Sequence, residues 1–518
     1  MDILHLYLCI ICLLPDYINA LWTYNAKKSR PHIIIIMADD LGWNDVSFHG
    51  SQEILTPQID RLAREGVILN NYYVTPMCSP SRAALMTGKY PIHTGMQHNV
   101  LYAAQPYGLG LEEKLLPQYL KEAGYRNHAI GKWHLGFFHK NYTPTYRGFD
   151  THFGHWTGHI DYFNHTAFEF GELGHDLHDG LNPTRNRSGH YITDIYTKKA
   201  EKVIFNHNTS EPMFLYLSHQ AVHAGNADDP LQTTERYFAR YPNIQNRDRR
   251  IFAGMVGALD ESVGRVYAAL KERKMLDNSI IIFTTDNGGA TAGYDRNKAS
   301  NWPLRGGKDT LFEGGVRATA FLWSPLLLQI PRVSTQMMHI TDWLPTLLYA
   351  AGIHKYIPGI DGFNMWPTLS HNFPSPRSEI LLNIDRQRGL YGLRVRNYKL
   401  IKGSTFAGLW DRWYGSKGTF DADTDNDVKI HSARIICQPP TDPSVTQSCR
   451  PSSGPCLFDL DEDPCEYRNI AAEQPAVLQR MMKRLAEYNE TVVRPRNRPM
   501  DQQARPRFHG GVWTTWRE

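Results

Sequence analysis

Short runs of apolar residues alternate along this chain with segments of amphipathic helical periodicity. The runs at residues 32–37, 213–218 and 279–285 are rich in β-branched and aromatic residues, which predicts strands buried on both faces of a parallel sheet. Helices are predicted between and after these strands, from Pro57 to a stop at Gly66, at residues 117–123, and at residues 251–270 and 477–488. Strands that alternate with helices indicate an α/β fold, with a large, mostly parallel central sheet flanked by helices.

The pattern changes near Pro374-Ser375-Pro376. Residues 391–402 beyond it have strand character suited to a short antiparallel sheet. A chain of 518 residues is also too long for one average domain. We therefore predict a catalytic domain at residues 21–375 and a smaller C-terminal domain at residues 376–518.

The pattern at the start of the chain is typical of a signal peptide. Residues 3–14 are almost wholly apolar but too few to span a membrane, and Ala20 offers a small residue at a cleavage site. We predict a signal peptide at residues 1–20, entry into the secretory pathway and no stable membrane insertion; an uncleaved anchor or a buried strand is the alternative. Four glycosylation sequons agree with secretion, at Asn164, Asn186, Asn208 and Asn489.

Overall charge and hydropathy exclude several classes of protein. The formal net charge is +4, which is too small to argue for nucleic acid as a partner, and the mean hydropathy is −0.45. Hydrophobic residues make up 42% of the chain and charged residues 21%, so a disordered chain is excluded.

The chain has seven cysteines in three settings. Cys9 and Cys12 fall in the predicted signal peptide, and Cys78 stands alone as a candidate reactive group. The other four lie close together and predict two disulfides, with the pairing left open; they are Cys437, Cys449, Cys456 and Cys465. A zinc site is the alternative, but the cluster contains no C-x-x-C pair.

Polar residues follow four predicted strands at the points where the strands end. They are Asp39 and Asp40, Lys132 and His134, His223, and Asp286 and Asn287. Because ligands bind beyond the carboxyl ends of parallel strands, we expect these side chains to converge. Three carboxylates placed together repel one another unless a cation neutralises them, and oxygen ligands favour Ca²⁺ or Mg²⁺. The alternative is that each acidic segment is an ordinary turn.

Cys78 begins the segment Cys78-x-Pro80-x-Arg82. Pro80 can open a helix that Gly88 ends, so Cys78 is expected near a helix N-terminus with Arg82 one turn further on. An unmodified thiolate in that position is expected to be acidic and nucleophilic. The alternative is an ordinary buried cysteine.

These motifs together resemble a known family. Cys78-x-Pro80-x-Arg82, continued to Thr87-Gly88, is similar to the signature of type I sulfatases, and the segment from Gly124 to His134 resembles their second signature, with Asn127 where Ser or Thr is usual. The resemblance extends over roughly residues 31–490 and implies an alkaline-phosphatase-like fold. Within the family the chain most resembles arylsulfatase B, on the segments Asn301 to Gly306, His339 to Thr346 and Asp361-Gly362-Phe363.

The resemblance implies a cofactor and a modification. Cys78 would be oxidised to Cα-formylglycine (3-oxoalanine) by a formylglycine-generating enzyme during synthesis, and the hydrated aldehyde would attack sulfur. One Ca²⁺ per chain would be bound by Asp39, Asp40, Cys78, Asp286 and Asn287.

The resemblance also implies roles for the cationic side chains. Lys132, His223 and Lys308 would bind the sulfate group, with His223 as general acid for the leaving oxygen. Lys132, His134 and Arg82 would orient and stabilise the hydrate of Cys78.

A sulfatase is therefore the predicted function, and its substrate stays open. The resemblance suggests N-acetylgalactosamine 4-sulfate of glycosaminoglycans, or a similar sulfated sugar; a small sulfated metabolite such as a glucosinolate is an alternative. A phosphoesterase of the same fold and a non-catalytic protein that binds sulfated glycans are further alternatives. Predicted loops at residues 137–190, 224–250 and 403–455 would decide the choice of substrate. The site of action would be lysosomal or extracellular.

Overall fold

The computed structural model describes residues 30–415, 433–437 and 439–518. The predicted signal peptide, with Cys9 and Cys12, lies outside the described residues. Within them, no helix is both long enough and apolar enough to cross a membrane.

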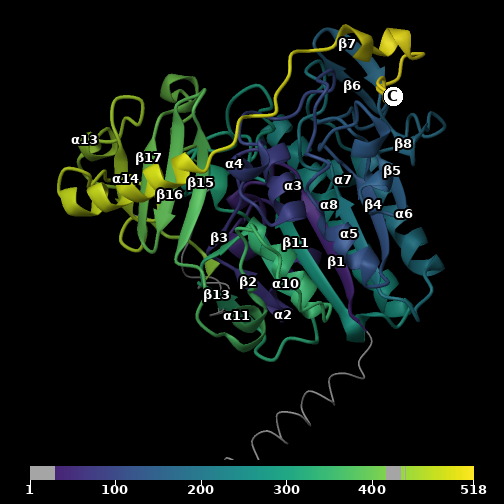
Figure 1. Ribbon diagram of the computed structural model, residues 1–518, viewed down its shortest axis with the longest axis horizontal. Helices are drawn as coiled ribbons and strands as arrows, with labels where there is room; N and C mark the ends of the chain where they lie inside the picture. The colour runs from purple at the N-terminus through teal and green to yellow at the C-terminus, as the bar shows by residue number, and fades with distance from the viewer. Residues whose placement is uncertain (1–29, 416–432, 438) are drawn as a thin grey trace, which may run out of the picture.

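A ten-stranded mixed sheet forms the centre of the larger part of the molecule (Figure 1). Across the sheet its strands are β13 (Arg332–Ser334), β2 (Val67–Leu69), β12 (Ala320–Trp323), β11 (Ser279–Thr285), β1 (His32–Ala38), β10 (Met213–Ser218), β4 (Arg126–Gly131), β5 (Thr151–Gly154), β8 (His178–Asp179) and β9 (Asn182–Pro183). The five neighbours from β11 to β5 are parallel, and antiparallel strands flank them on both sides. The sequence prediction of a large sheet with a parallel centre is confirmed.

Helices pack around this sheet in two groups. The first contains α2 (Pro57–Glu65), α6 (Ile192–Asn206) and α8 (Arg247–Glu272), and the second contains α3 (Cys78–Thr87), α5 (Leu116–Glu122) and α10 (Trp343–Ala350). Shorter helices are α4 (Pro91–Thr94), α7 (Glu235–Phe238), α9 (Glu313–Val316), α11 (Trp366–His371) and α13 (Pro443–Thr446). Every residue of β1 is buried, which explains why its sequence is apolar throughout rather than alternating.

The register of the central strands brings their carboxyl ends to one edge. Met37 of β1 lies opposite Ser218 of β10 and Thr284 of β11, and Ser218 lies opposite Gly131 of β4. The polar residues that follow these four strands therefore start from the same edge of the sheet, as expected for a site in an open parallel sheet.

A separate four-stranded antiparallel sheet forms the smaller part of the molecule (Figure 1). Its strands are β15 (Glu379–Asp385), β16 (Leu390–Val395), β17 (Tyr398–Lys402) and β18 (Cys456–Asp459), and α14 (Pro475–Glu490) packs against it. Two-stranded sheets pair β3 (Tyr72–Tyr73) with β14 (Met338–His339) and β6 (Thr166–Glu169) with β7 (Glu172–His175). The predicted antiparallel sheet is confirmed, while the boundary at residue 375 stays a prediction.

The four clustered cysteines form two disulfides. Cys437 pairs with Cys465 and Cys449 pairs with Cys456. All four sulfurs are therefore used in disulfides, so the alternative of a zinc site is wrong.

The end of the chain returns to the larger part of the molecule. After α14 the chain crosses the molecule and reaches the β6–β7 hairpin (Figure 1). There Val512 bridges to His175, and the fully buried Trp513 donates its indole N–H to the Ala167 carbonyl at 3.0 Å. Trp513 belongs to the main hydrophobic core, so these last residues pack with the large sheet rather than with the small one.

We predict that Trp513→Ala lowers the free energy of unfolding by about 3–5 kcal/mol, because it removes a fully buried aromatic side chain. Urea denaturation followed by circular dichroism measures the change. Phe508→Ala is the matched control, because Phe508 is exposed on the same segment and its loss should cost about 0.5 kcal/mol or less. Equal stability of the two variants would contradict the packing of the tail.

Candidate active site

Cys78 is the first residue of α3. Met77 before it has extended backbone, and Gly88 ends the helix in the left-handed conformation, as the sequence predicts. The Cys78 side chain is buried, and burial raises the pKa of its thiol to about 11, although the Lys132 and Lys308 ammonium groups oppose the rise. This direction is opposite to the expected acidic thiolate: at such a pKa the unmodified thiol is protonated near neutral pH.

Arg82 lies one turn further along α3 and is completely buried. Its guanidinium donates to the Asp286 carboxylate through Nε at 3.0 Å and Nη2 at 2.7 Å, and Nη2 lies 3.4 Å from Asp39. The same guanidinium donates to the Ser218 hydroxyl and to the Lys132 carbonyl. Arg82 thus ties α3 to the ends of all four central strands.

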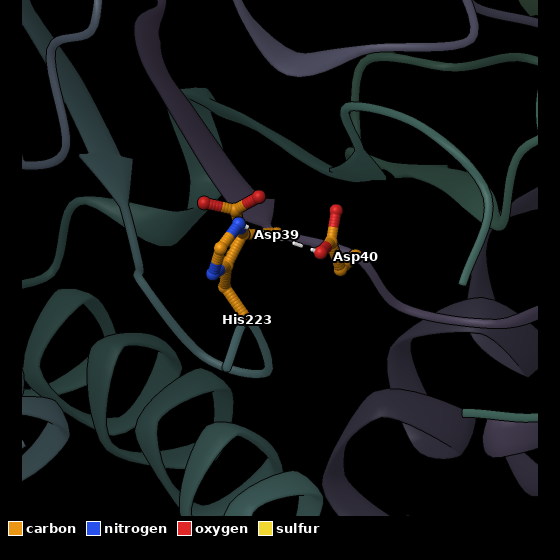
Figure 2. Close-up of side chains that lie close together, drawn as sticks. All are labelled: Asp39, Asp40 and His223. Atoms are coloured by element: carbon orange, nitrogen blue, oxygen red, sulfur yellow. Dashed lines mark ion pairs between the residues drawn. The ribbon is translucent and has the colours of Figure 1, made fainter. Parts of the chain in front are cut away.

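The acidic residues converge where β1 and β11 end. Asp39 and Asp40 follow β1, Asp286 and Asn287 follow β11, and all four side chains are buried. Asn287 donates its side-chain amide to Asp40 at 2.7 Å. Burial and the nearby Asp39 carboxylate raise the pKa of Asp286, as expected where carboxylates crowd together. Figure 2 shows Asp39 and Asp40 beside the imidazole of His223.

Two lysines pair with these carboxylates. The Lys132 ammonium contacts Asp39, and both side chains are fully buried. The Lys308 ammonium lies 2.9 Å from Asp40 and 2.8 Å from Asp295. Burial disfavours the charged form of Lys308, but Asp295 and Asp40 outweigh it and raise the pKa of Lys308 well above its usual value. Protein cations therefore already neutralise part of the acidic cluster, so repulsion between carboxylates does not by itself require a metal ion.

Unpartnered oxygens are the stronger argument for a divalent cation. Oδ1 of Asp39 and Oδ1 of Asn287 are buried without a hydrogen-bond partner, which is costly unless a ligand binds there. Ligand atoms of Asp39, Cys78 and Asp286 lie within 4.8 Å of one another. The donors are mainly oxygens, so the residues fit a hard cation such as Ca²⁺ or Mg²⁺.

The balance of charge points the same way. The carboxylates of the site are Asp39, Asp40, Asp286 and Asp295, and its permanent cations are Arg82, Lys132 and Lys308. With all of them ionised, the carboxylates outnumber the cations by one, and an anionic ester would be repelled. A bound divalent cation makes the site net positive, as binding of an anion requires.

The two histidines present different nitrogens to the site. Nε2 of His134 lies 2.7 Å from the Leu101 carbonyl, which can only accept, so this nitrogen carries the proton and the buried Nδ1 is an unpartnered acceptor. Burial lowers the pKa of His134 well below its usual value and keeps the ring neutral. Nδ1 of His223 likewise donates to the Ala224 carbonyl, and its Nε2 accepts from the Lys308 ammonium at 3.0 Å.

These groups lie along a cavity of about 510 Å³. Cys78, His134, His223 and Lys308 line it. Its described lining residues do not include Arg82, Lys132 or the acidic cluster of Asp39, Asp40, Asp286 and Asn287. The structure thus brings together every residue that the sequence analysis placed in the site.

The sequence analysis missed three polar residues of the cavity. Asp295 contacts Lys308, the ring of His159 stacks on that of His223 with centroids 5.8 Å apart, and Glu169 comes from the β6–β7 hairpin. Asp295 and Glu169 do not directly follow a strand of the parallel centre. His159 follows β5, a strand that the sequence analysis did not predict.

The predicted loops contribute unequally to the cavity. Residues 137–190 supply several lining residues, and no described residue of 224–250 lines it. The segment 403–455 approaches it through Phe406 and Trp410, whose rings contact the lining residue Tyr294.

Comparison with known proteins places these features in one family. The sulfatase family model matches residues 31–353. Arylsulfatase J of Mus musculus is 41% identical over 515 residues, covering 95% of this chain and 81% of that protein. Human arylsulfatase A is 30% identical over 481 residues, covering 88% of this chain and 87% of that protein. Human N-acetylgalactosamine-6-sulfatase is 34% identical over 355 residues, covering 65% of this chain and 66% of that protein.

Solved structures agree with these relatives. The crystal structure of Ps i-CgsB superposes with a TM-score of 0.72 at 29% identity, covering 90% of this chain and 94% of that one. The PsFucS1 sulfatase from Pseudoalteromonas sp. has a TM-score of 0.69 at 23% identity, covers 93% and 95%, and supports the fold alone. With the sheet, the buried acidic cluster and the cysteine at the start of α3, these matches establish that the chain belongs to the sulfatase family and is a sulfuric ester hydrolase.

Proposed function

We propose that this protein cleaves sulfate esters with a Cα-formylglycine derived from Cys78 and with a bound Ca²⁺. The observation that carries the proposal is the position of Cys78, which lines the cavity with its sulfur beside the carboxylates of Asp39 and Asp286. Cys78 is also the one cysteine outside a disulfide among the described residues, and its protonated thiol would be a poor nucleophile if left unmodified.

The residues that would hold Ca²⁺ are Asp39, Asp40, Asp286 and Asn287, next to the modified Cys78. The cation would supply positive charge to the sulfate oxygens. The hydrated aldehyde would supply one hydroxyl for attack on sulfur and a second whose proton is lost when sulfate is expelled. Arg82 and Lys132 hold the carboxylates of Asp286 and Asp39, and the charges of both act on Cys78. They would orient and stabilise the hydrate of Cys78, and Lys132 would also bind the sulfate group.

His223 and Lys308 would serve the leaving group. Their hydrogen bond holds a proton between Nε2 and Nζ at the wall of the cavity, where the alcohol oxygen departs. The bare Nδ1 of His134 would accept a hydrogen bond from a hydroxyl on the modified Cys78. These assignments use each nitrogen in the protonation state that its backbone contact imposes.

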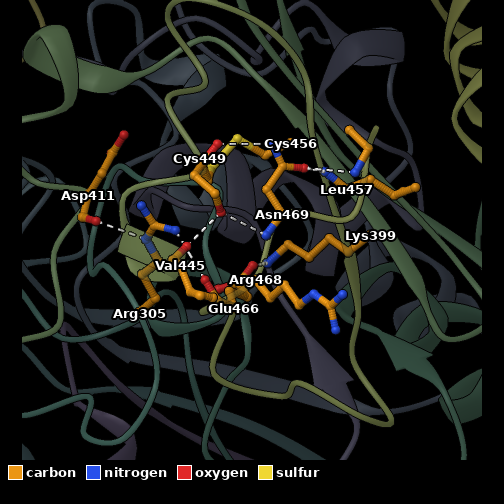
Figure 3. The surroundings of a disulfide bond; sticks show 12 residues. Arg305, Lys399, Asp411, Val445, Cys449, Cys456, Leu457, Glu466, Arg468 and Asn469 are labelled. Atoms are coloured by element: carbon orange, nitrogen blue, oxygen red, sulfur yellow. Dashed lines mark hydrogen bonds and ion pairs between the residues drawn. A yellow bond between two sulfur atoms is a disulfide. The ribbon is translucent and has the colours of Figure 1, made fainter. Parts of the chain in front are cut away.

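The disulfides support a proposal for the compartment in which the protein acts. Figure 3 shows the Cys449–Cys456 disulfide close to Asn469 and Leu457, and such bonds persist in oxidising compartments. We propose passage through the secretory pathway, contact there with a formylglycine-generating enzyme, and action in the lysosome or outside the cell. The sequons at Asn164, Asn186 and Asn208 are exposed, and that at Asn489 is half-buried with its amide oxygen bonded to Arg386, so the first three are the better glycosylation sites.

The substrate proposed from sequence resemblance is a sulfated sugar, with N-acetylgalactosamine 4-sulfate suggested by the resemblance to arylsulfatase B. The human relative named N-acetylgalactosamine-6-sulfatase and the Ps i-CgsB structure with k-i-k-neocarrahexaose make a sugar substrate reasonable for this fold. A small sulfated metabolite is the second candidate, because the cavity is compact and has aromatic walls.

Removal of divalent cations tests the acidic cluster directly. We expect Ca²⁺ at about a hundredfold excess over its Kd to stabilise chelator-treated protein by about 2.7 kcal/mol, seen as a rise in Tm. Asn287→Leu should abolish this rise, because it removes a ligand oxygen without changing the charge near Arg82. Asp228→Asn, at an exposed carboxylate, is the control and should keep it. A wild-type Tm that does not respond to Ca²⁺ would refute the site.

Mass spectrometry of the peptide that contains Cys78 tests the modification. The expected mass corresponds to one oxygen in place of one sulfur and two hydrogens, and Cys78→Ala should lower sulfate release by at least about 10³-fold. Phe508→Ala, on the surface, serves as control. An intact thiol in active protein, or faster hydrolysis of 4-nitrophenyl phosphate than of 4-nitrophenyl sulfate, would refute the proposed chemistry.

A further inference from the structure

Beyond the sulfate end, the walls of the cavity are aromatic. Phe168 and Phe170 of the β6–β7 hairpin are 48% and 47% exposed, and the ring of Phe170 contacts that of Tyr102 with centroids 5.1 Å apart. Tyr294, which is 88% exposed, also lines the cavity and lies beside the rings of Phe406 and Trp410. Exposed aromatic side chains gathered at a cavity mark a binding surface for an apolar face.

Phe170 is also in an unfavourable backbone conformation. It and Gly171 form the two-residue turn between β6 and β7, with φ of 54° and 77°. Such turns need positive φ at both positions and favour Asn followed by Gly, whereas a bulky residue is disfavoured there. The turn geometry therefore does not explain why residue 170 is a phenylalanine. Residues with strained backbone conformations of this kind cluster at ligand sites.

The described residues that line the cavity offer no cation that is free to bind a second anionic group of the substrate. Among the described lining residues, Lys308 is the one lysine or arginine, and its ammonium already contacts Asp40, Asp295 and His223. The other charged lining residues are the carboxyl groups of Asp295 and Glu169. Glu169 is buried and accepts the backbone N–H of Ala103 at 2.6 Å. Among the described lining residues, a carboxylate next to the sulfated ring would find no free cation and would face the carboxylate of Asp295.

We propose that the alcohol part of the substrate is an uncharged ring with an apolar face, which packs against Phe170, Phe168 and Tyr102 with Tyr294 at the mouth. The proposal rests on the proposed sulfatase function and narrows it. A neutral sulfated sugar and an aryl sulfate share the required chemistry. A glycosaminoglycan end in which a uronate adjoins the sulfated sugar carries an additional negative charge and lacks this chemistry. The cavity therefore disfavours the polyanionic substrate suggested by sequence resemblance.

Kinetics with matched esters test the charge requirement. The probes are 4-nitrophenyl sulfate, the methyl glycoside of N-acetylgalactosamine 4-sulfate, and a disaccharide in which a uronate adjoins that sugar, as free acid and as methyl ester. We expect kcat/KM for the methyl ester to exceed that for the free acid by about tenfold. An equal value, or a preference for the free acid, overturns the proposal. The first two probes tell whether the neutral ring is a phenol or a sugar.

Phe170→Asn tests the aromatic wall without endangering the fold. Asn suits the positive φ, so Tm should stay the same or rise, while KM for the better neutral substrate should rise about fivefold to tenfold through loss of ring contact. Phe373→Ala, at an exposed aromatic residue that neither lines the cavity nor belongs to the C-terminal segment, should leave KM unchanged. An unchanged KM in Phe170→Asn, with an active wild type, overturns this inference alone; a wild type that releases no sulfate from any probe overturns the proposed function with it.

Discussion

The geometry of the site depends on one buried guanidinium. Arg82 has no contact with solvent, so the cost of burying its charge must be met by the groups that surround it. Those groups come from the ends of β11, β1, β10 and β4, and they fix where Asp286 and Asp39 place their oxygens. Because Arg82 and Cys78 share the first turns of α3, the same contact also fixes the candidate nucleophile relative to the acidic cluster.

This arrangement separates two tasks among the cations. Arg82 and Lys132 are buried behind the carboxylates and hold them in place, whereas Lys308 and His223 reach the cavity and can meet a ligand. Groups held in advance by buried ion pairs need little reorganisation when charge develops during a reaction. The family's chemistry is thus supported by contacts that an inspection of the cavity walls alone would not reveal.

The sequence correctly predicted those site residues that the topology of the parallel sheet brings together. Parallel strands end at one edge, so Asp39, His223 and Asp286 could be brought together from their positions after apolar runs. Asp295 and Glu169 lie in a loop and a hairpin, whose course no periodicity describes. The pKa of Cys78 was missed for another reason: a helix N-terminus is visible in sequence, but the burial that opposes it is a property of the folded chain.

The route of the last residues links distant parts of the sequence. Trp513 bonds to Ala167 on β6, and Val512 bridges to His175 on β7, so the chain's end buttresses the hairpin that bears Phe168 and Phe170. Residues more than three hundred positions apart in the sequence thereby pack together. The residues around Trp513 therefore help to hold the hairpin that carries two lining residues of the cavity, although none of them lines it.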